Sequence, residues 1–194
     1  MVLWRARLQA SRPRLSGRCR LAPASARCKM DVTLREFQEA DIAALDIWAE
    51  DIGSQDFMSR YRPKNVAVTA HSPEQGILWF VIRFSDRDIG TVWLEGDMAS
   101  DQAILGIFLG EASLLGRGIG QKAINLALEY AEQLGRLRTI LLNVRKNNTR
   151  AIACYKKCGF HVVASGVKRA VTGAEIHYLT MQRSIPEKVA CGRT

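Results

Sequence analysis

Residues 103–134 combine an apolar run, a glycine-rich loop and an amphipathic pattern, in that order. The run 103–109 predicts a buried strand, and apolar side chains at three- and four-residue spacings predict a helix that stops at Gly135. Between them, Leu115-Gly116-Arg117-Gly118-Ile119-Gly120 leaves backbone N–H groups accessible at a helix N-terminus, where the helix dipole favours an anion. This order predicts a strand-loop-helix unit that binds a phosphate.

Two common phosphate-binding loops do not fit the spacing. A Walker loop ends in Gly-Lys-Ser/Thr, so that a lysine reaches the terminal phosphates and a hydroxyl holds magnesium, but Gly120 is followed by Gln121 and Lys122. A dinucleotide fingerprint needs a third glycine at position 121 and an acidic residue about 20 positions later, and residues 139–144 contain no acid. The ligand therefore belongs to another class of phosphate compound.

The net charge of +9 is concentrated at one end of the 194-residue chain. Residues 1–29 hold eight arginines and lysines and no acid, which leaves +1 for the rest. The remainder therefore gives no indication of a specific nucleic-acid partner, although the basic segment itself could contact polyanions. The length suits a single domain of about 100 to 200 residues, and an apolar content of 47% is enough for a sizeable core.

The basic segment 1–29 is predicted to lie outside the folded domain. It lacks the apolar core of a secretory signal and is typical either of an organellar transit peptide or of an upstream extension whose true start is Met30. We expect a disordered leader over 1–29, one domain over 30–183 and a flexible tail over 184–194. The longest apolar run, 77–82, is far short of the ~20 residues of a membrane span, so no membrane partner is predicted.

Cysteine and histidine spacing gives no metal or disulfide site. Cys154 and Cys158 lie one helical turn apart, which is wrong for a Cys-x-x-Cys pair, and we expect two small, buried helix residues in a reduced compartment. The three histidines show no ligand spacing. The predicted location is the cytoplasm, or an organelle if 1–29 is a transit peptide.

Periodicity along the chain predicts a mixed α/β fold, in which helices flank a mostly antiparallel central sheet. A strand and a helix come first, a meander of three strands follows, and strand-helix-strand units complete the domain. The expected strands are 32–36, 77–84, 89–95, 103–109, 139–145, 160–164 and 175–181, and the expected helices are 40–50, 120–134 and 149–158.

The glycine loop and a second motif together resemble the GCN5-related N-acetyltransferase (GNAT) family. In that family, Arg/Gln-x-x-Gly-x-Gly/Ala lies at a strand-to-helix turn, and an asparagine precedes a tyrosine by seven residues, with Gly-Phe after it. This chain has Gly118 and Gly120 in the first motif, and Asn148, Tyr155 and Gly159-Phe160 in the second. The resemblance spans about residues 30–183. Within the family, the chain is similar to bacterial-type small-molecule or ribosomal-protein N-acetyltransferases. Leu115 departs from it, because the family usually has Arg or Gln there.

The resemblance implies an acetyltransferase that moves the acetyl group of acetyl-CoA to an amine by direct attack in a ternary complex. It places the pyrophosphate on the N–H groups of 116–120, the pantetheine arm on the backbone of 109–111 and on Asn148, and the departing thiolate beside Tyr155 as general acid. Asn148 could instead be only a helix cap, and Tyr155 only an aromatic anchor. The predicted acetyl-CoA contacts are Leu109, Gly110, Leu115, Gly116, Arg117, Gly118, Ile119, Gly120 and Asn148, and the predicted catalytic residue is Tyr155.

The general base and the acceptor stay open at this point. Related N-terminal acetyltransferases have a carboxylate where this chain has Asn143, so Glu111, Glu95, Asp97 or a water chain are the alternatives. The acceptor is a small-molecule amine or a protein N-terminus, shaped by residues 51–76 and 167–173, and a homodimer stays open. A second hypothesis is a non-catalytic acetyl-CoA-binding module, and a third is a nucleic-acid-associated protein acting through 1–29.

Overall fold

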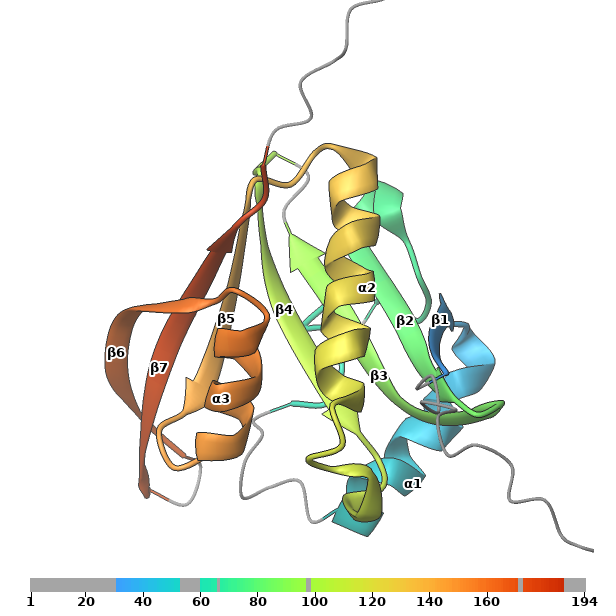
Figure 1. Ribbon diagram of the computed structural model, residues 1–194, viewed down its shortest axis with the longest axis horizontal. Helices are drawn as coiled ribbons and strands as arrows, with labels where there is room; N and C mark the ends of the chain where they lie inside the picture. The colour runs from blue at the N-terminus through green and yellow to red at the C-terminus, as the bar shows by residue number, and fades with distance from the viewer. Residues whose placement is uncertain (1–30, 53–59, 66, 97–98, 171–172, 187–194) are drawn as a thin grey trace, which may run out of the picture.

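A seven-stranded sheet with helices on both faces forms the molecule in this computed structural model, which describes residues 31–52, 60–65, 67–96, 99–170 and 173–186 (Figure 1). The strand order is β1-β2-β3-β4-β5-β7-β6, and every neighbouring pair is antiparallel except β4 and β5. The predicted fold class is confirmed. The strands are β1 (Val32–Glu36), β2 (Ile77–Phe84), β3 (Arg87–Gly96), β4 (Gln102–Leu109), β5 (Thr139–Arg145), β6 (His161–Arg169) and β7 (Glu175–Ser184); the helices are α1 (Ile42–Ile52), α2 (Ile119–Leu134) and α3 (Thr149–Lys157), with short 3₁₀ turns η1 (Glu39–Asp41), η3 (Pro73–Gln75) and η4 (Ala112–Leu114).

Several predictions fall on residues outside these ranges. They include the basic leader 1–29, most of the tail 184–194, Asp97, and the part of 51–76 that lies between residues 53 and 59. Within the described ranges, no helix is long and apolar enough to cross a membrane.

Several element boundaries differ from the predictions, and three of these differences have a clear local reason. The first helical segment begins with η1, because the Asp41 carboxylate accepts the Gln38 N–H (2.9 Å) and fixes a tight turn there. β3 begins at Arg87 rather than residue 89, since Ser85 and Asp86 take positive φ angles and make a two-residue hairpin turn. β6 runs to Arg169 instead of 164: it is an exposed edge strand without apolar alternation, so periodicity underestimates its length.

Two apolar cores lie on opposite faces of the sheet. α2 buries Ile124, Leu128 and neighbouring side chains against one face, and α3 packs partly buried residues beside them. On the other face, Leu45 of α1 joins Trp79 and Trp93 in a smaller core. Figure 1 shows α2 and α3 on one side of the sheet and α1 on the other. The sheet therefore lies between two separate apolar layers.

The sheet opens between its two parallel strands. β4 and β5 pair only from Gln102↔Thr139 to Ile104↔Leu141, whereas β3 follows β4 to Leu109 and β7 follows β5 to Arg145. In Figure 1 the two strands lie close together at one end and diverge toward the end where α2 begins. The second edge of β4 is consequently unpaired from residue 105 onward.

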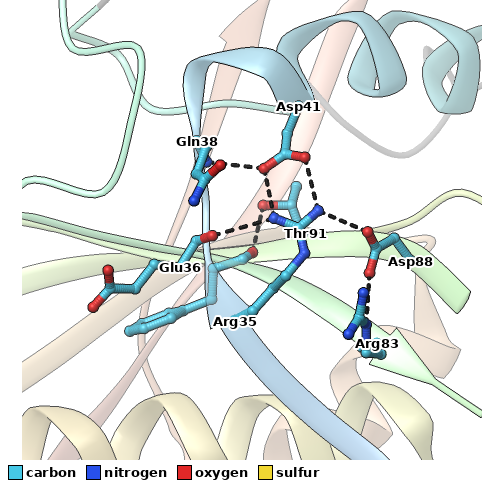
Figure 2. A network of polar contacts seen from close by, with 8 residues as sticks. Arg35, Glu36, Gln38, Asp41, Arg83, Asp88 and Thr91 are labelled. Carbon is cyan, nitrogen blue, oxygen red and sulfur yellow. Dashed lines mark hydrogen bonds and ion pairs between the residues drawn. The ribbon is translucent and has the colours of Figure 1, made fainter. Parts of the chain in front are cut away.

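An arginine-centred network joins the first strand to the hairpin. Arg35 donates to both carboxylate oxygens of Asp41 (2.7 and 2.8 Å) and to Asp88 (2.7 Å), and Arg83 donates to Asp88 from the other side (3.1 Å). Figure 2 shows Arg35 between the two carboxylates. Hydrogen bonding from Arg35 lowers the pKa of Asp41; partial burial raises the pKa of Asp88, but the bonds from Arg35 and Arg83 outweigh it and lower the net value. This network fixes β1, η1 and β3 relative to one another.

The arginine network predicts acid-sensitive stability. Because folding lowers the pKa of both carboxyls, their contribution is complete above the unfolded value of about 3.9 and is lost as the pH falls through the folded values. We expect Asp41→Asn to cost about 1–2 kcal/mol at pH 7 and to flatten the decline in stability below pH ~4. Urea unfolding between pH 3 and 7 measures both effects.

The control for this measurement is Glu39→Gln, which changes an exposed carboxylate on the same turn. Its unfolding curves should follow the wild type at every pH. Equal stabilities of wild type and Asp41→Asn from pH 3 to 7 would contradict a stabilising role for the network.

Candidate active site

A cavity of about 710 Å³ occupies the gap between β4 and β5. Its walls come from most of β4, the glycine loop, the start of α2, α3, and the end of β5. Single residues of β3, β6 and β7 and residues Arg60 and Lys64 before β2 complete them. A cavity of this volume is of the usual size for a small-molecule ligand. Because the gap passes through the sheet, the cavity reaches both the α2 and α3 side and the α1 side.

The glycine loop presents free donors to this cavity. None of the backbone N–H groups of residues 116–121 donates to another protein group in the described chain, and the first helical bond of α2 is Lys122 N–H to Gly118 O (3.0 Å). Gly116 and Gly118 take φ angles of +80° and +83°, a region that disfavours side chains with a Cβ. Both line the cavity together with Gly120. The arrangement suits a diphosphate, because the dipole of α2 adds to the free donors.

The structure brings six of the nine predicted cofactor residues to the cavity wall. The three others are not among the lining residues: Gly110 donates its N–H to Ile89 O (2.8 Å), the Ile119 side chain is completely buried, and Arg117 is exposed. The six that line the cavity are Leu109, Leu115, Gly116, Gly118, Gly120 and Asn148.

Strand alternation directs the Leu109 N–H into the gap. Gly110 and Ile89 form a hydrogen-bonded pair across β4 and β3, so the N–H of Leu109, one residue earlier, points away from β3. Since β4 has no partner on that edge beyond Ile104, this N–H faces the cavity. It is a donor aimed at the space between the strands.

Asn148 both caps α3 and lines the cavity. Its Oδ1 accepts the Ala151 N–H (3.1 Å), which satisfies one of the donors at the start of the helix. That bond fixes the amide orientation and leaves Nδ2 without a partner among the described residues. The capping and ligand-binding interpretations of Asn148 are therefore compatible.

Tyr155 lies on α3 with its side chain at the cavity wall. Its ring packs against Phe160 with centroids 6.2 Å apart, and it touches the main core. Burial raises the pKa of Tyr155 above its ordinary value, with further contributions from Cys154 and Cys158. The hydroxyl consequently stays protonated at neutral pH and can serve as a donor, while the ring also anchors the helix.

The two cysteines of α3 occupy different environments. Cys158 is buried as expected, and its thiol points toward Gln121 O (3.8 Å). Cys154 is only half-buried and lines the cavity, contrary to the prediction that both are buried. Over the described ranges, no group of three or more His, Cys, Asp or Glu side chains is arranged to hold a metal ion.

The carboxylates considered as general base lie away from the cavity or are already paired. Glu111 forms an ion pair with Arg87 (3.1 Å) and does not line the cavity. Glu95 accepts from Arg60 (2.5 Å) and from two backbone N–H groups, and also lies outside the lining. Asn143 does line it, with its Oδ1 accepting the Thr180 hydroxyl (2.8 Å). Of the described lining residues, none is Asp, Glu or His.

On the α1 side of the cavity, Arg60, Lys64 and Lys168 come from the segments 51–76 and 167–173 that were expected to shape the acceptor site, whereas sequence reasoning missed Trp93, Arg145 and Tyr178. Trp93 lies across Gly106, where a Cβ would be 2.1 Å from the indole, and the Arg60 guanidinium lies 5.7 Å from the Trp93 ring centroid. The one available signal was Gly106 within an apolar strand, because such a glycine often marks close approach of another group. The other residues of this wall are Lys64, Asn143, Arg145, Lys168 and Tyr178.

Comparison with known proteins identifies the family of this chain. The family model described as the acetyltransferase (GNAT) domain matches residues 31–161. A peptidyl-lysine N-acetyltransferase of Salmonella typhimurium is 28% identical over 60% of this chain and 73% of its own, and the "Probable N-acetyltransferase san" of Drosophila melanogaster is 33% identical over 58% of this chain and 65% of its own.

Solved structures agree on the fold. The spermidine N-acetyltransferase of Vibrio cholerae, in complex with CoA and spermine, superposes with a TM-score of 0.67 at 21% identity, covering 79% of this chain and 95% of its own. The Salmonella typhimurium acetyltransferase that modifies the N-terminal serine of ribosomal protein L7/L12 superposes with a TM-score of 0.68 at 16% identity. The match covers 80% of this chain and 95% of that structure. With a family model that spans most of the domain and a glycine loop and tyrosine at one cavity, the chain belongs to the GNAT acetyltransferase family.

Proposed function

We propose that the protein is an acetyl-CoA-dependent N-acetyltransferase that transfers the acetyl group directly to a primary amine. The observation that carries this proposal is the single cavity that joins the free N–H groups of the glycine loop to Tyr155 across the gap in the sheet. A diphosphate at the loop and a thioester near Tyr155 would lie along that cavity. The relatives' names fit the same reaction class.

Three features support binding of the donor. Free N–H groups and the α2 dipole would hold the pyrophosphate at Gly116, Gly118 and Gly120. The unpaired edge of β4 and the Asn148 amide nitrogen would bind the pantetheine amides, much as a neighbouring strand would. Arg150 and Lys157 line the same cavity from α3 and add positive charge for phosphate.

The cavity also supplies groups for the chemical step. Acetyl-CoA supplies an activated thioester, whose carbonyl carbon the amine nitrogen attacks while the thiolate departs. The Leu109 N–H is aimed into the gap, where it would stabilise the negative charge that develops on the carbonyl oxygen. Tyr155, protonated at neutral pH, would donate its hydroxyl proton to the departing sulfur.

A non-catalytic acetyl-CoA-binding module is the second candidate. It is favoured by the lack of a carboxylate or imidazole on the described cavity wall, where Asn143 stands in the position of a base. Tyr155 argues for catalysis, because a binding module needs no proton donor near the thioester. Release of free thiol in the presence of an amine panel distinguishes the two.

Removal of the tyrosine hydroxyl should slow turnover without weakening donor binding. We expect Tyr155→Phe to lower kcat by about one to two orders of magnitude, since only the proton donor is lost, and to leave the Kd for acetyl-CoA nearly unchanged. Steady-state thiol release and calorimetric titration measure the two quantities.

Tyr130→Phe is the matched control. Tyr130 lies on α2, packs edge-on against Phe80 and does not line the cavity. Its kcat should equal that of the wild type. A Tyr155→Phe enzyme with unchanged kcat would remove this residue from the mechanism.

A change in the glycine loop should weaken donor binding. Gly116 and Gly135 have similar positive φ angles, +80° and +70°, and a Cβ would meet nothing within 4 Å at either. Alanine is therefore equally strained at both, but only Gly116 lines the cavity. We expect Gly116→Ala to raise the Kd for CoA about three- to tenfold through displacement of the N–H groups, and Gly135→Ala to leave it unchanged. Equal Kd values for CoA in the wild type and Gly116→Ala, measured by calorimetry, would argue against this loop as the phosphate site.

A further inference from the structure

The cavity wall is unusually one-sided in charge. Among the described lining residues, six are arginine or lysine, and none is aspartate or glutamate. Arg150 and Lys157 lie on α3, next to the proposed donor site. The four others are Arg60, Lys64, Arg145 and Lys168.

Strand alternation places Arg145 and Lys168 on the opposite face of the sheet. Val144 and Leu142 of β5 pack in the core beneath α2, so Arg145 points toward the α1 side. Tyr178 is paired with Arg145 on β5 and with Gly166 on β6, and Lys168 follows Gly166 by two residues. These side chains therefore share one face, away from α2.

Arg60 and Lys64 reach the cavity beside Trp93, which belongs to the core on the α1 side. All four cations thus lie on the side that the proposed acetyl donor leaves open. This side is where an acceptor amine would approach.

Among the described residues, the carboxylate of Glu95 next to this wall is already neutralised. Glu95 binds Arg60 by an ion pair and accepts the backbone N–H groups of Lys64 (2.6 Å) and Asn65 (3.2 Å). The Lys64 ammonium, by contrast, has no ion-pair partner in the described part of the chain. An anionic group of an acceptor would therefore meet the Lys64 ammonium here.

We infer that the acceptor is an α-amine with a carboxylate a few bonds away from the reacting nitrogen, and that Lys64 binds this carboxylate. The inference rests on the proposed acetyltransferase function. Two sources share this chemistry: a free amino acid, and a peptide N-terminus with an acidic first residue.

The same charges explain how an acceptor could react without a carboxylate or imidazole base. Nearby cations disfavour an ammonium ion, so they lower the pKa of a bound amine. The α-amine of a peptide N-terminus titrates near 7.7–8.0, about 2.5 units below a lysine side chain, and a further decrease of more than about one unit makes it largely neutral at pH 7. The α-amine of a free amino acid needs a larger decrease, because its own carboxylate favours the ammonium form. Bulk water can then accept the remaining proton.

Matched acceptors test the inference. The full-length protein is assayed for thiol release with acetyl-CoA and short amidated peptides that differ only in a first residue of aspartate, asparagine or lysine, together with free glutamate, free glutamine amide and spermidine. We expect the acidic peptide or the free amino acid to exceed its uncharged or basic counterpart in kcat/KM by about fivefold or more at low salt, and the preference to shrink as salt is added. The preferred arm, peptide or free amino acid, identifies the source.

Charge reversal at one position supplies the second test. Lys64→Glu should abolish or invert the preference for the acidic acceptor, Lys64→Gln should weaken it, and the Kd for CoA should stay unchanged in both. Arg62→Glu is the matched control, because Arg62 is exposed two residues away and does not line this cavity. Its acceptor preference should equal that of the wild type.

The outcomes test the inferred acceptor and the proposed acetyltransferase function separately. If no amine in the panel releases thiol, the proposed function fails. If amines are acetylated but spermidine or the lysine peptide is preferred, or if Lys64→Glu leaves the ranking of acceptors unchanged, the inference is overturned and the acetyltransferase proposal stands.

Discussion

Backbone pairing between β4 and β5 stops after three residues, and the cavity exists because of this loss of pairing. Each strand is held firmly by its other neighbour, β4 by β3 and β5 by β7, so the gap stays open without loss of the sheet. The free edge of β4 leaves N–H and C=O groups that a buried strand would normally satisfy. A ligand that carries amides can take the place of the missing strand.

The crossover from β4 to β5 places the remaining parts of the site. α2 starts at the open end of the gap, so the free N–H groups of the glycine loop point into it. α3 follows β5 directly and brings Asn148 and Tyr155 to the opposite wall. The proposed donor contacts therefore come from two consecutive strand-to-helix connections, while the proposed acceptor wall comes from the far face of the sheet. One opening would thus serve two ligands.

Local sequence signals were sufficient to predict the glycine loop and the cap of the third helix. Gly116 and Gly118 could be recognised because they adopt φ angles that other residues avoid, and Asn148 because it caps a helix three residues before the amide that it accepts. The family resemblance also assigned Gly110 and Ile119 to the donor site through their backbone groups, and the structure shows that the Gly110 N–H is bonded to β3 while the Ile119 side chain is in the core. A motif identifies a loop, but it does not say which of its groups face the cavity.

The sequence by itself determined the strand-loop-helix unit, the capped third helix, the mostly antiparallel α/β fold and the family, since each depends on residues within a few positions of one another. Only the tertiary structure decided which side chains form the proposed acceptor wall, because Lys64, Trp93 and Lys168 come from segments that strand order and side-chain alternation bring to one face. It also decided that Glu95 and Glu111 are paired elsewhere. The register between strands that are distant in the chain decides which side chains share a face. Hydrogen bonding between those strands sets this register, and neither periodicity nor local spacing in one sequence predicts it.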